Sequence, residues 1–162
     1  MFTFFKKRRS LTIIAPMSGK YIPLENVPDP VFSEKIMGNG IAIEPTDGNV
    51  YSPIDGEVIL IPPTKHAIGL RAVDGTEILI HIGLETVTLD GNGFHLLVDV
   101  GDKITVGQKL AEVQLNYIRT HAKSIVTPIV ITNDSDGKKT YTIPNPKEVI
   151  GGKTEVLTIT EN

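Results

Sequence analysis

Glycine and proline recur along this chain about every eight to twelve residues, with short runs rich in Val, Ile, Leu and Thr between them. This rhythm is typical of an all-β protein, an antiparallel sandwich or barrel in which short strands alternate with turns. Helical periodicity is weak by comparison. We therefore expect strands over residues 11–15, 40–43, 56–61, 68–73, 77–82, 108–113, 125–132 and 155–160, and short helices only over residues 30–37 and 115–123.

Two segments of the chain repeat one pattern. APMSGKYIPL, which begins at Ala15, and SPIDGEVILI, which begins at Ser52, share a proline, two further residues, a glycine and then strand-like sequence. The repetition favours a sandwich built from duplicated halves. A third segment, VDVGDKITVGQKLAEVQL from Val98, resembles the hairpin repeat of biotinyl and lipoyl carriers, but it lacks their exposed lysine flanked by Met or Ala.

Length and composition limit the kinds of chemistry available. With 162 residues, 40% of them hydrophobic, the chain can bury one substantial core, and we expect a single domain over residues 11–162. A net charge of -3 gives no general attraction for nucleic acid. Because there is no cysteine, disulfides, thiolate metal sites and cysteine nucleophiles are excluded, and the chain suits a reducing cytoplasm.

The first ten residues are a separate feature. Phe2, Phe4 and Phe5 precede the basic run KKRR at residues 6–9, an order opposite to that of a signal peptide. Aromatic residues beside cations suit the surface of an anionic membrane, where each basic residue adds about 1 kcal/mol. We expect residues 1–10 to form a flexible segment or one that contacts the inner face of the cell membrane.

The most informative stretch is TKHAIGLRAVDGTEILIHIGLET, residues 64–86, because Asp74-Gly75 between two β-rich runs is a strong signal for a two-residue hairpin turn. If these two residues form the turn, His66 faces Gly83 and His81 faces Ile68. The two histidines then lie on one face as diagonal neighbours, about 7–8 Å apart at the backbone. This spacing brings the two imidazoles within reach of each other.

The same register sorts the apolar residues of the hairpin. Ile78, Ile80 and Ile82 would face the core, whereas Ile68, Leu70 and Leu79 would share the histidine face. Apolar surroundings would shield from water a group attached to an imidazole, such as a phosphoryl group, and would offer a docking surface to a protein partner. We therefore predict a partner surface made by a set of five residues: Phe32, Ile68, Leu70, Leu79 and Glu85.

Paired imidazoles suit phosphoryl transfer between proteins. With an ordinary pKa of about 6.5, an imidazole is neutral and nucleophilic near pH 7 and also a good leaving group. A second imidazole can stabilise the equatorial oxygens of the phosphoryl group during its transfer. The spacing leaves two alternatives open: the histidines simply pack or bind water, or His66 and His81 hold an adventitious or regulatory zinc ion with Glu85 as a third ligand.

Several blocks of sequence together resemble the glucose-family IIA proteins of the bacterial sugar phosphotransferase system. They are TKHAIGL from Thr64, EILIHIGLETV from Glu77, LDGNGFHLLVDVGDKITVGQKL from Leu89, and VPDPVFSEKIMGNGIAIEPTDGNVYSPIDGEV from Val27. With KSIVTPIVITN from Lys123, the resemblance covers roughly Ile13 to the end of the chain.

This resemblance implies an antiparallel β-sandwich of duplicated halves that carries phosphate between proteins. His81 would accept phosphate from the carrier protein HPr, and His66 would support its transfer. Thr64 matches the position that orients the histidine pair, and Gly83 matches the glycine whose carbonyl approaches an imidazole. The phosphate would pass to a IIB domain of a sugar permease. The alternative is a regulatory module whose phosphorylation state other enzymes or transporters detect.

Some positions depart from the family pattern. Glu85 stands where many relatives carry Asp, and Pro62-Pro63 stands where some carry a surface Phe. His95 follows the turn at residues 91–93 and His121 lies in the helix expected over residues 115–123, and we expect both to be exposed surface groups. The glycines at residues 91–93 lack the following Lys-Thr of a nucleotide loop, so no nucleotide or other cofactor is expected.

Overall fold

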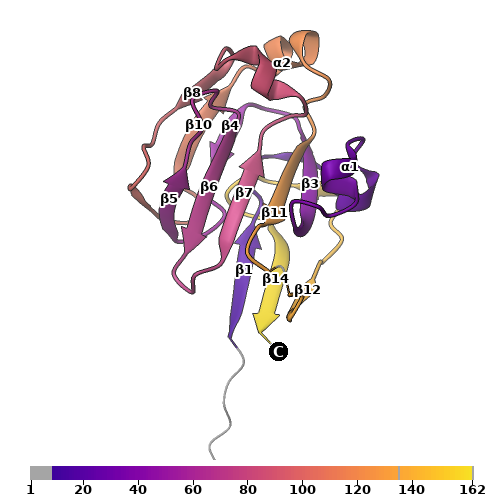
Figure 1. Ribbon diagram of the computed structural model, residues 1–162, viewed down its shortest axis with the longest axis vertical. Helices are drawn as coiled ribbons and strands as arrows, with labels where there is room; N and C mark the ends of the chain where they lie inside the picture. Colours follow the sequence, from indigo (N-terminus) through magenta and orange to yellow (C-terminus); the bar gives the residue numbers. More distant parts are fainter. Residues whose placement is uncertain (1–8, 135, 162) are drawn as a thin grey trace, which may run out of the picture.

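A computed structural model describes residues 9–134 and 136–161 of the chain (Figure 1). The segment predicted over residues 1–10 therefore lies almost entirely outside the described residues. The strands are β1 (Ser10–Ile14), β2 (Gly19–Pro23), β3 (Asn39–Pro45), β4 (Asn49–Tyr51), β5 (Gly56–Leu60), β6 (Ala67–Ala72), β7 (Glu77–His81), β8 (Phe94–Leu96), β9 (Lys103–Ile104), β10 (Lys109–Val113), β11 (Thr127–Ile131), β12 (Lys139–Thr142), β13 (Glu148–Val149) and β14 (Glu155–Glu161). The helices are α1 (Pro30–Ser33) and α2 (Leu115–His121), with 3-10 turns η1 (Leu24–Asn26) and η2 (Thr86–Leu89).

The strands form one large sheet and two small ones, and every described strand pairing is antiparallel. The eight-stranded sheet has the order β13-β2-β3-β11-β7-β6-β5-β9, and the three-stranded sheets have the orders β1-β14-β12 and β4-β10-β8. The all-β prediction is confirmed, and each strand predicted from the sequence is present. The repeated motif also has a structural counterpart, since β2 and β5 both begin at its glycine, Gly19 and Gly56 respectively.

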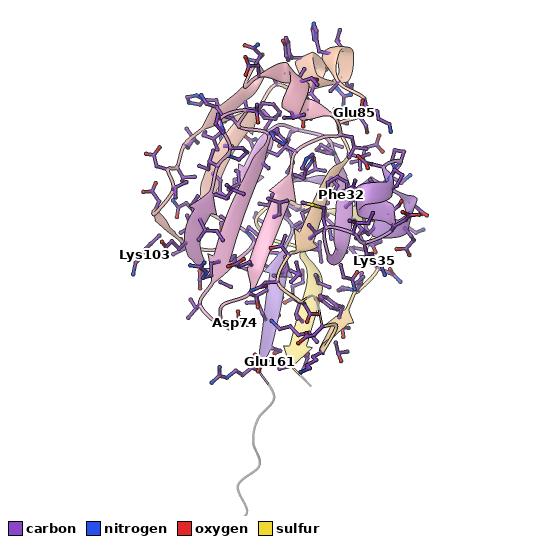
Figure 2. All side chains as sticks on the ribbon, viewed as in Figure 1. Phe32, Lys35, Asp74, Glu85, Lys103 and Glu161 are labelled. Carbon is purple, nitrogen blue, oxygen red and sulfur yellow. The ribbon has the colours of Figure 1, made fainter. Side chains whose placement is uncertain are left out.

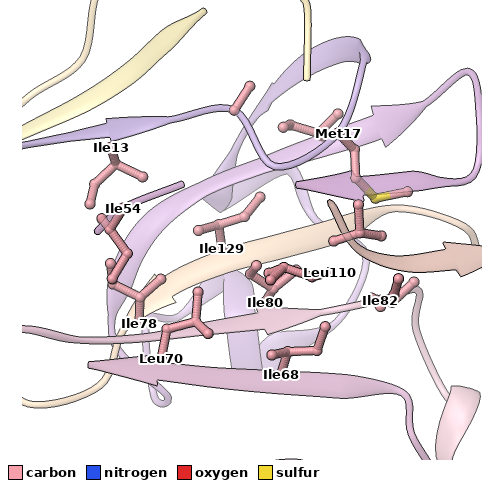
Figure 3. Close-up of a cluster of buried hydrophobic side chains, with 14 of the residues drawn as sticks. Ile13, Met17, Ile54, Ile68, Leu70, Ile78, Ile80, Ile82, Leu110 and Ile129 are labelled. Atoms are coloured by element: carbon pink, nitrogen blue, oxygen red, sulfur yellow. The ribbon is translucent and has the colours of Figure 1, made fainter. Parts of the chain in front are cut away.

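Alternation along the large sheet divides its side chains between two clusters. Ile78, Ile80 and Ile82 enter the main core, where each is at most 1% exposed (Figure 3). Leu79, which lies between them in the sequence, joins a smaller cluster on the opposite face together with Phe32 from α1. A single strand thus supplies both layers, and α1 covers the smaller one.

The β6-β7 hairpin differs from its predicted register by one residue. Ala67 pairs with His81, and Ile68 pairs with Ile80. The cause is the turn, because a backbone hydrogen bond from Ala72 to the Thr76 carbonyl (2.8 Å) closes a loop of three residues rather than two. Its last residue, Gly75, has φ +92, which is the left-handed position that three-residue hairpin loops assign to glycine.

This register corrects part of the predicted partner surface. Ile68 and Leu70 lie opposite Ile80 and Ile78, so they point into the main core and are fully buried (Figure 3). Their placement on the histidine face was wrong, because a one-residue slip moves every side chain of a strand to the other face. Leu79 does lie on the other face, but it is 8% exposed and is covered by the second cluster.

Candidate functional site

The two predicted histidines meet at the end of the hairpin away from its turn. His81 is the last residue of β7, and His66 immediately precedes β6. Their ring centroids lie 5.0 Å apart with the planes at 79°, so the rings meet edge to face. Figure 2 labels Asp74 at the turn, whereas Glu85 and Phe32 lie towards the histidine end. The predicted proximity of the two imidazoles is confirmed, although the register from which it was predicted is not.

The orientation of His81 is set by Gly83. The carbonyl oxygen of Gly83 lies 2.8 Å from His81 Nδ1. A carbonyl can only accept, so Nδ1 carries the proton and the lone pair of the neutral ring lies on Nε2. Gly83 has φ +74, and a Cβ there would lie 2.6 Å from Thr86 Cγ2. Only glycine supplies this carbonyl position without strain.

The orientation of His66 is set by Thr64. Thr64 Oγ1 lies 2.7 Å from His66 Nδ1. A hydroxyl can donate to an unprotonated nitrogen or accept from a protonated one. The Thr64 contact therefore supports both neutral tautomers of His66, in contrast to the single tautomer that Gly83 imposes on His81.

Phe32 forms the floor of the site. Its ring centroid lies 4.9 Å from that of His81, and its side chain is 3% exposed. Phe32 lies in the short helix α1, which is capped by Asp29, whose carboxylate accepts a hydrogen bond from the Val31 backbone N–H, and which begins with Pro30. Phe32 was predicted as partner surface, but it is buried beneath His81 because α1 lays it against the sheet.

Both imidazoles favour their neutral forms. Burial lowers the pKa of His81, while the Gly83 carbonyl and the Asp29 carboxylate oppose that shift. Burial also lowers the pKa of His66, and the neighbouring His81 adds to the effect. At pH 7 each ring is therefore a neutral group with a nitrogen lone pair available.

Buried threonines hold the segment that supplies the Gly83 carbonyl. The Gly83 backbone N–H donates to Thr127 Oγ1 (3.3 Å), and Thr86 Oγ1 donates to the Ile82 carbonyl (2.7 Å). Both threonines are fully buried. Neither threonine was predicted as a site residue, because a threonine within or beside a β-rich run carries no sign of whether its hydroxyl supports a site or only extends a strand.

The remaining predicted residues lie at the edges of the site or away from it. Glu85 is exposed and left-handed (φ +56), directly before η2. Among the described residues, no three His, Asp or Glu side chains converge to hold a metal ion, so the zinc alternative with Glu85 as third ligand is not formed. His95 and His121 are exposed, as predicted, and His121 stacks on Tyr117 with ring centroids 4.2 Å apart.

Exposed apolar residues lie on the two short elements next to the site residues, in or just after α1, which holds Phe32, and in η2, which follows Gly83 and Glu85. Ile36, just after α1, is 69% exposed, and Val87 of η2 is 52% exposed. Val31, within α1, and Met37, just after it, are exposed as well. Large exposed apolar side chains on a protein surface suit contact with a protein partner.

Comparison with known proteins identifies the class to which this fold and site belong. The family described as phosphoenolpyruvate-dependent sugar phosphotransferase system, EIIA 1, matches residues 11–137. The chain is 49% identical over 152 residues to the PTS system glucose-specific EIIA component of Staphylococcus epidermidis strain ATCC 12228, covering 94% of this chain and 91% of that protein. It is 48% identical over 155 residues to the component of the same name from Staphylococcus aureus strain MRSA252, covering 96% and 93%.

A solved structure agrees with these relatives. The glucose permease IIA from Mycoplasma capricolum superimposes with a TM-score of 0.87 at 40% identity, covering 97% of this chain and 99% of that one. The chain therefore belongs to the EIIA 1 family and is a phosphocarrier of the sugar phosphotransferase system. This favours the carrier over the regulatory module considered from the sequence. Within the described residues, no helix is long and apolar enough to cross a membrane.

Proposed function

We propose that His81 is the phosphoacceptor and that its Nε2 forms the bond to phosphorus. The observation that carries this proposal is the hydrogen bond from His81 Nδ1 to the Gly83 carbonyl, which leaves Nε2 with the lone pair. As the new N–P bond forms, the bond between phosphorus and the phosphohistidine of HPr breaks, and its electron pair stays with the donor imidazole. The step needs no proton to leave His81, because Nδ1–H is retained.

His66 supports the transfer. When the Thr64 hydroxyl donates to His66 Nδ1, the proton of the neutral ring lies on Nε2 and can contact an equatorial oxygen of the phosphoryl group. Such a contact stabilises the transition state most, because the charge of the transferring phosphoryl group is then spread over its equatorial oxygens. His66 thus acts as a hydrogen-bond donor beside the nucleophile.

HPr and a IIB domain dock in turn on the apolar border of the site. The exposed apolar area of this surface comes from Val31, Ile36, Met37 and Val87. The exposed carboxylate of Glu85 offers a contact for a basic side chain of the partner. The permease served is one for glucose, the sugar named for both staphylococcal relatives and for the Mycoplasma structure.

Residues 1–9 form a peripheral anchor that holds the carrier at the inner face of the membrane beside its permease. The support is compositional, from three phenylalanines and four cations at residues 2–9. Deleting residues 1–9 should abolish sedimentation with anionic phosphatidylglycerol vesicles and leave phosphorylation in solution unchanged. Vesicle binding equal to that of the full chain would contradict the anchor.

The phosphoacceptor is tested by incubating the protein with phosphoenolpyruvate, enzyme I and HPr and mapping the acid-labile phosphate. Phosphate should be found on His81. The His81→Gln variant should accept none, whereas His66→Gln should accept phosphate from HPr but pass it on slowly. His95→Gln is the matched control, because His95 is an exposed histidine of β8 that does not belong to the pair. Stable phosphate on His66 instead of His81 would reverse the assignment.

A further inference from the structure

His66 points to the side of the sheet opposite to that expected from its place in the hairpin. The Ile82 backbone N–H donates to the His66 carbonyl (2.7 Å), so these two residues continue the ladder in which Ala67 pairs with His81. Alternation would then send the His66 side chain into the core with Ile68. Instead its ring is half-buried and meets the ring of His81, whose side chain lies on the opposite face of the sheet from Ile68.

The departure from regular strand geometry occurs at Lys65. This residue has φ +58, in the left-handed region that is uncommon for any residue with a Cβ. A tight turn precedes it, because the Lys65 backbone N–H donates to the Pro62 carbonyl (2.8 Å) and Pro63 fixes φ at the second position of the turn. The chain therefore reverses sharply just before His66, and β6 begins only at Ala67.

The Lys65 side chain does not explain why a strained residue stands here. It is exposed, and within the part of the chain that the structure describes its ammonium group forms no ion pair. Its stem lies near Gly91, where an added Cβ would come within 3.8 Å of Lys65 Cδ, an ordinary van der Waals distance. What distinguishes Lys65 is its backbone conformation between the two residues, Thr64 and His66, whose side chains are hydrogen-bonded to each other.

We propose that Lys65 is a positioning residue for phosphoryl transfer. Its left-handed backbone bends the chain so that Thr64 Oγ1 meets His66 Nδ1. The same bend turns the His66 ring away from the core-facing side of the sheet and onto the side that carries His81. The inference rests on the proposed role of the histidine pair. It implies that this position accepts residues that tolerate positive φ, namely glycine and asparagine, and rejects β-branched residues regardless of charge.

The test compares Lys65→Gly and Lys65→Asn, which permit the left-handed backbone, with Lys65→Val, which opposes it. The first readout is NMR titration of the imidazoles, which requires no phosphorylation. Glycine and asparagine variants should keep the lowered pKa of His66, whereas the valine variant should move it towards about 6.5, the value of a free histidine. The second readout is phosphate passed on to a IIB domain, which should fall about tenfold only in the valine variant.

Asn145→Val is the matched control. Asn145 is exposed, lies between β12 and β13, and has φ +54, so valine imposes the same backbone strain away from the histidines. It should lower stability to a similar degree without moving the pKa of His66. If Lys65→Val does not fold, Lys65→Ala replaces it, because alanine disfavours the left-handed backbone less than valine does. The pKa of His66 should then shift in the same direction by a smaller amount.

Two outcomes would overturn the inference. If Lys65→Val and Lys65→Gly titrate alike at His66 and transfer alike, the backbone of Lys65 has no positioning role. If Lys65→Gly keeps the pKa of His66 but loses transfer, the ammonium group is what matters. Failure of the proposed function is distinguishable from both, because His66→Gln would then transfer normally while the titration of the Lys65 variants still reported on geometry.

Discussion

At the scale of single residues, the site depends on two neutral histidines whose rings are oriented in different ways. His81 is fixed in one tautomer by a carbonyl, whereas His66 faces a hydroxyl that accommodates either. The proposed nucleophile, His81, thus has its reactive nitrogen defined before a partner arrives, while the proposed supporting group, His66, can exchange donor and acceptor roles. The pairing of the two imidazoles was predictable from the hairpin, but their burial, which lowers the pKa of both, depends on the whole fold.

The lowered pKa values predict a pH dependence of stability. The unfolded chain binds protons at its histidines near pH 6.5, and the folded chain does so only at lower pH. Stability should therefore be intact above about pH 7 and fall as the pH decreases from about 6.5 through the folded pKa values. Urea unfolding across this range should show the decline, and a His66→Gln, His81→Gln double variant should show less of it. An unchanged slope in the double variant would contradict the burial argument.

The Thr64 hydroxyl gives a second prediction at this scale. Thr64→Val keeps the shape of the side chain but removes the group that orients His66. Acceptance of phosphate by His81 should persist, while onward transfer should slow by about tenfold, equivalent to about 1.4 kcal/mol in the barrier. Thr64→Ser, which keeps the hydroxyl, should transfer at nearly the normal rate. Equal rates in the valine and serine variants would exclude an orienting role.

At the scale of elements, the glycine and proline rhythm predicts many of the longer strands, because these are short runs with apolar residues bounded by turn residues. The strands that it missed include two-residue pairings such as β9 and β13, which exist only through their neighbours in the sheet and have no local pattern. The hairpin was predicted but not its register, since Asp-Gly suits both two-residue and three-residue loops. The true loop includes Val73 and ends at Gly75.

The turn after β7 carries a prediction about Gly83. In Gly83→Ala, the new Cβ would lie 2.6 Å from Thr86 Cγ2 and 2.9 Å from the Ser124 carbonyl oxygen. Unfolding free energy should fall by about 2 kcal/mol, and phosphorylation of His81 should slow as the carbonyl shifts. Gly101→Ala is the matched control, because Gly101 also has positive φ (+96) but has no other atom within 4 Å of the added Cβ. Equal losses in both would attribute the effect to backbone strain alone.

At the scale of the whole molecule, the proposed partner surface is assembled from segments distant in the sequence. Ile36 follows α1 and Val87 belongs to η2, and the fold brings α1 and the end of β7 together through the contact of Phe32 with His81. Of the surface predicted from the sequence, only Glu85 is exposed. Ile68 and Leu70 belong to the main core, because the register differs by one residue from the predicted one, and Phe32 and Leu79 belong to the smaller cluster.

This surface predicts a separation between stability and transfer. Ile36→Ser and Val87→Ser should change the free energy of unfolding by no more than about 0.5 kcal/mol, since both side chains are exposed. Transfer from HPr should nevertheless slow by about tenfold. Val73→Ser is the control, because Val73 is 87% exposed at the hairpin turn, away from the histidines. A normal rate of transfer in the Ile36 and Val87 variants would remove them from the docking surface.

The pairing of β1 with β14 has a consequence for how this domain can be linked to others. Ser10 lies opposite Thr160, so the described chain begins and finishes on adjacent strands, away from α2 (Figure 1). A short peptide could join these points and new ends could be opened at the solvent-facing turn of Gly101. Such a circular permutant should still become phosphorylated, and a neighbouring domain could be fused at either end without obstructing the histidines.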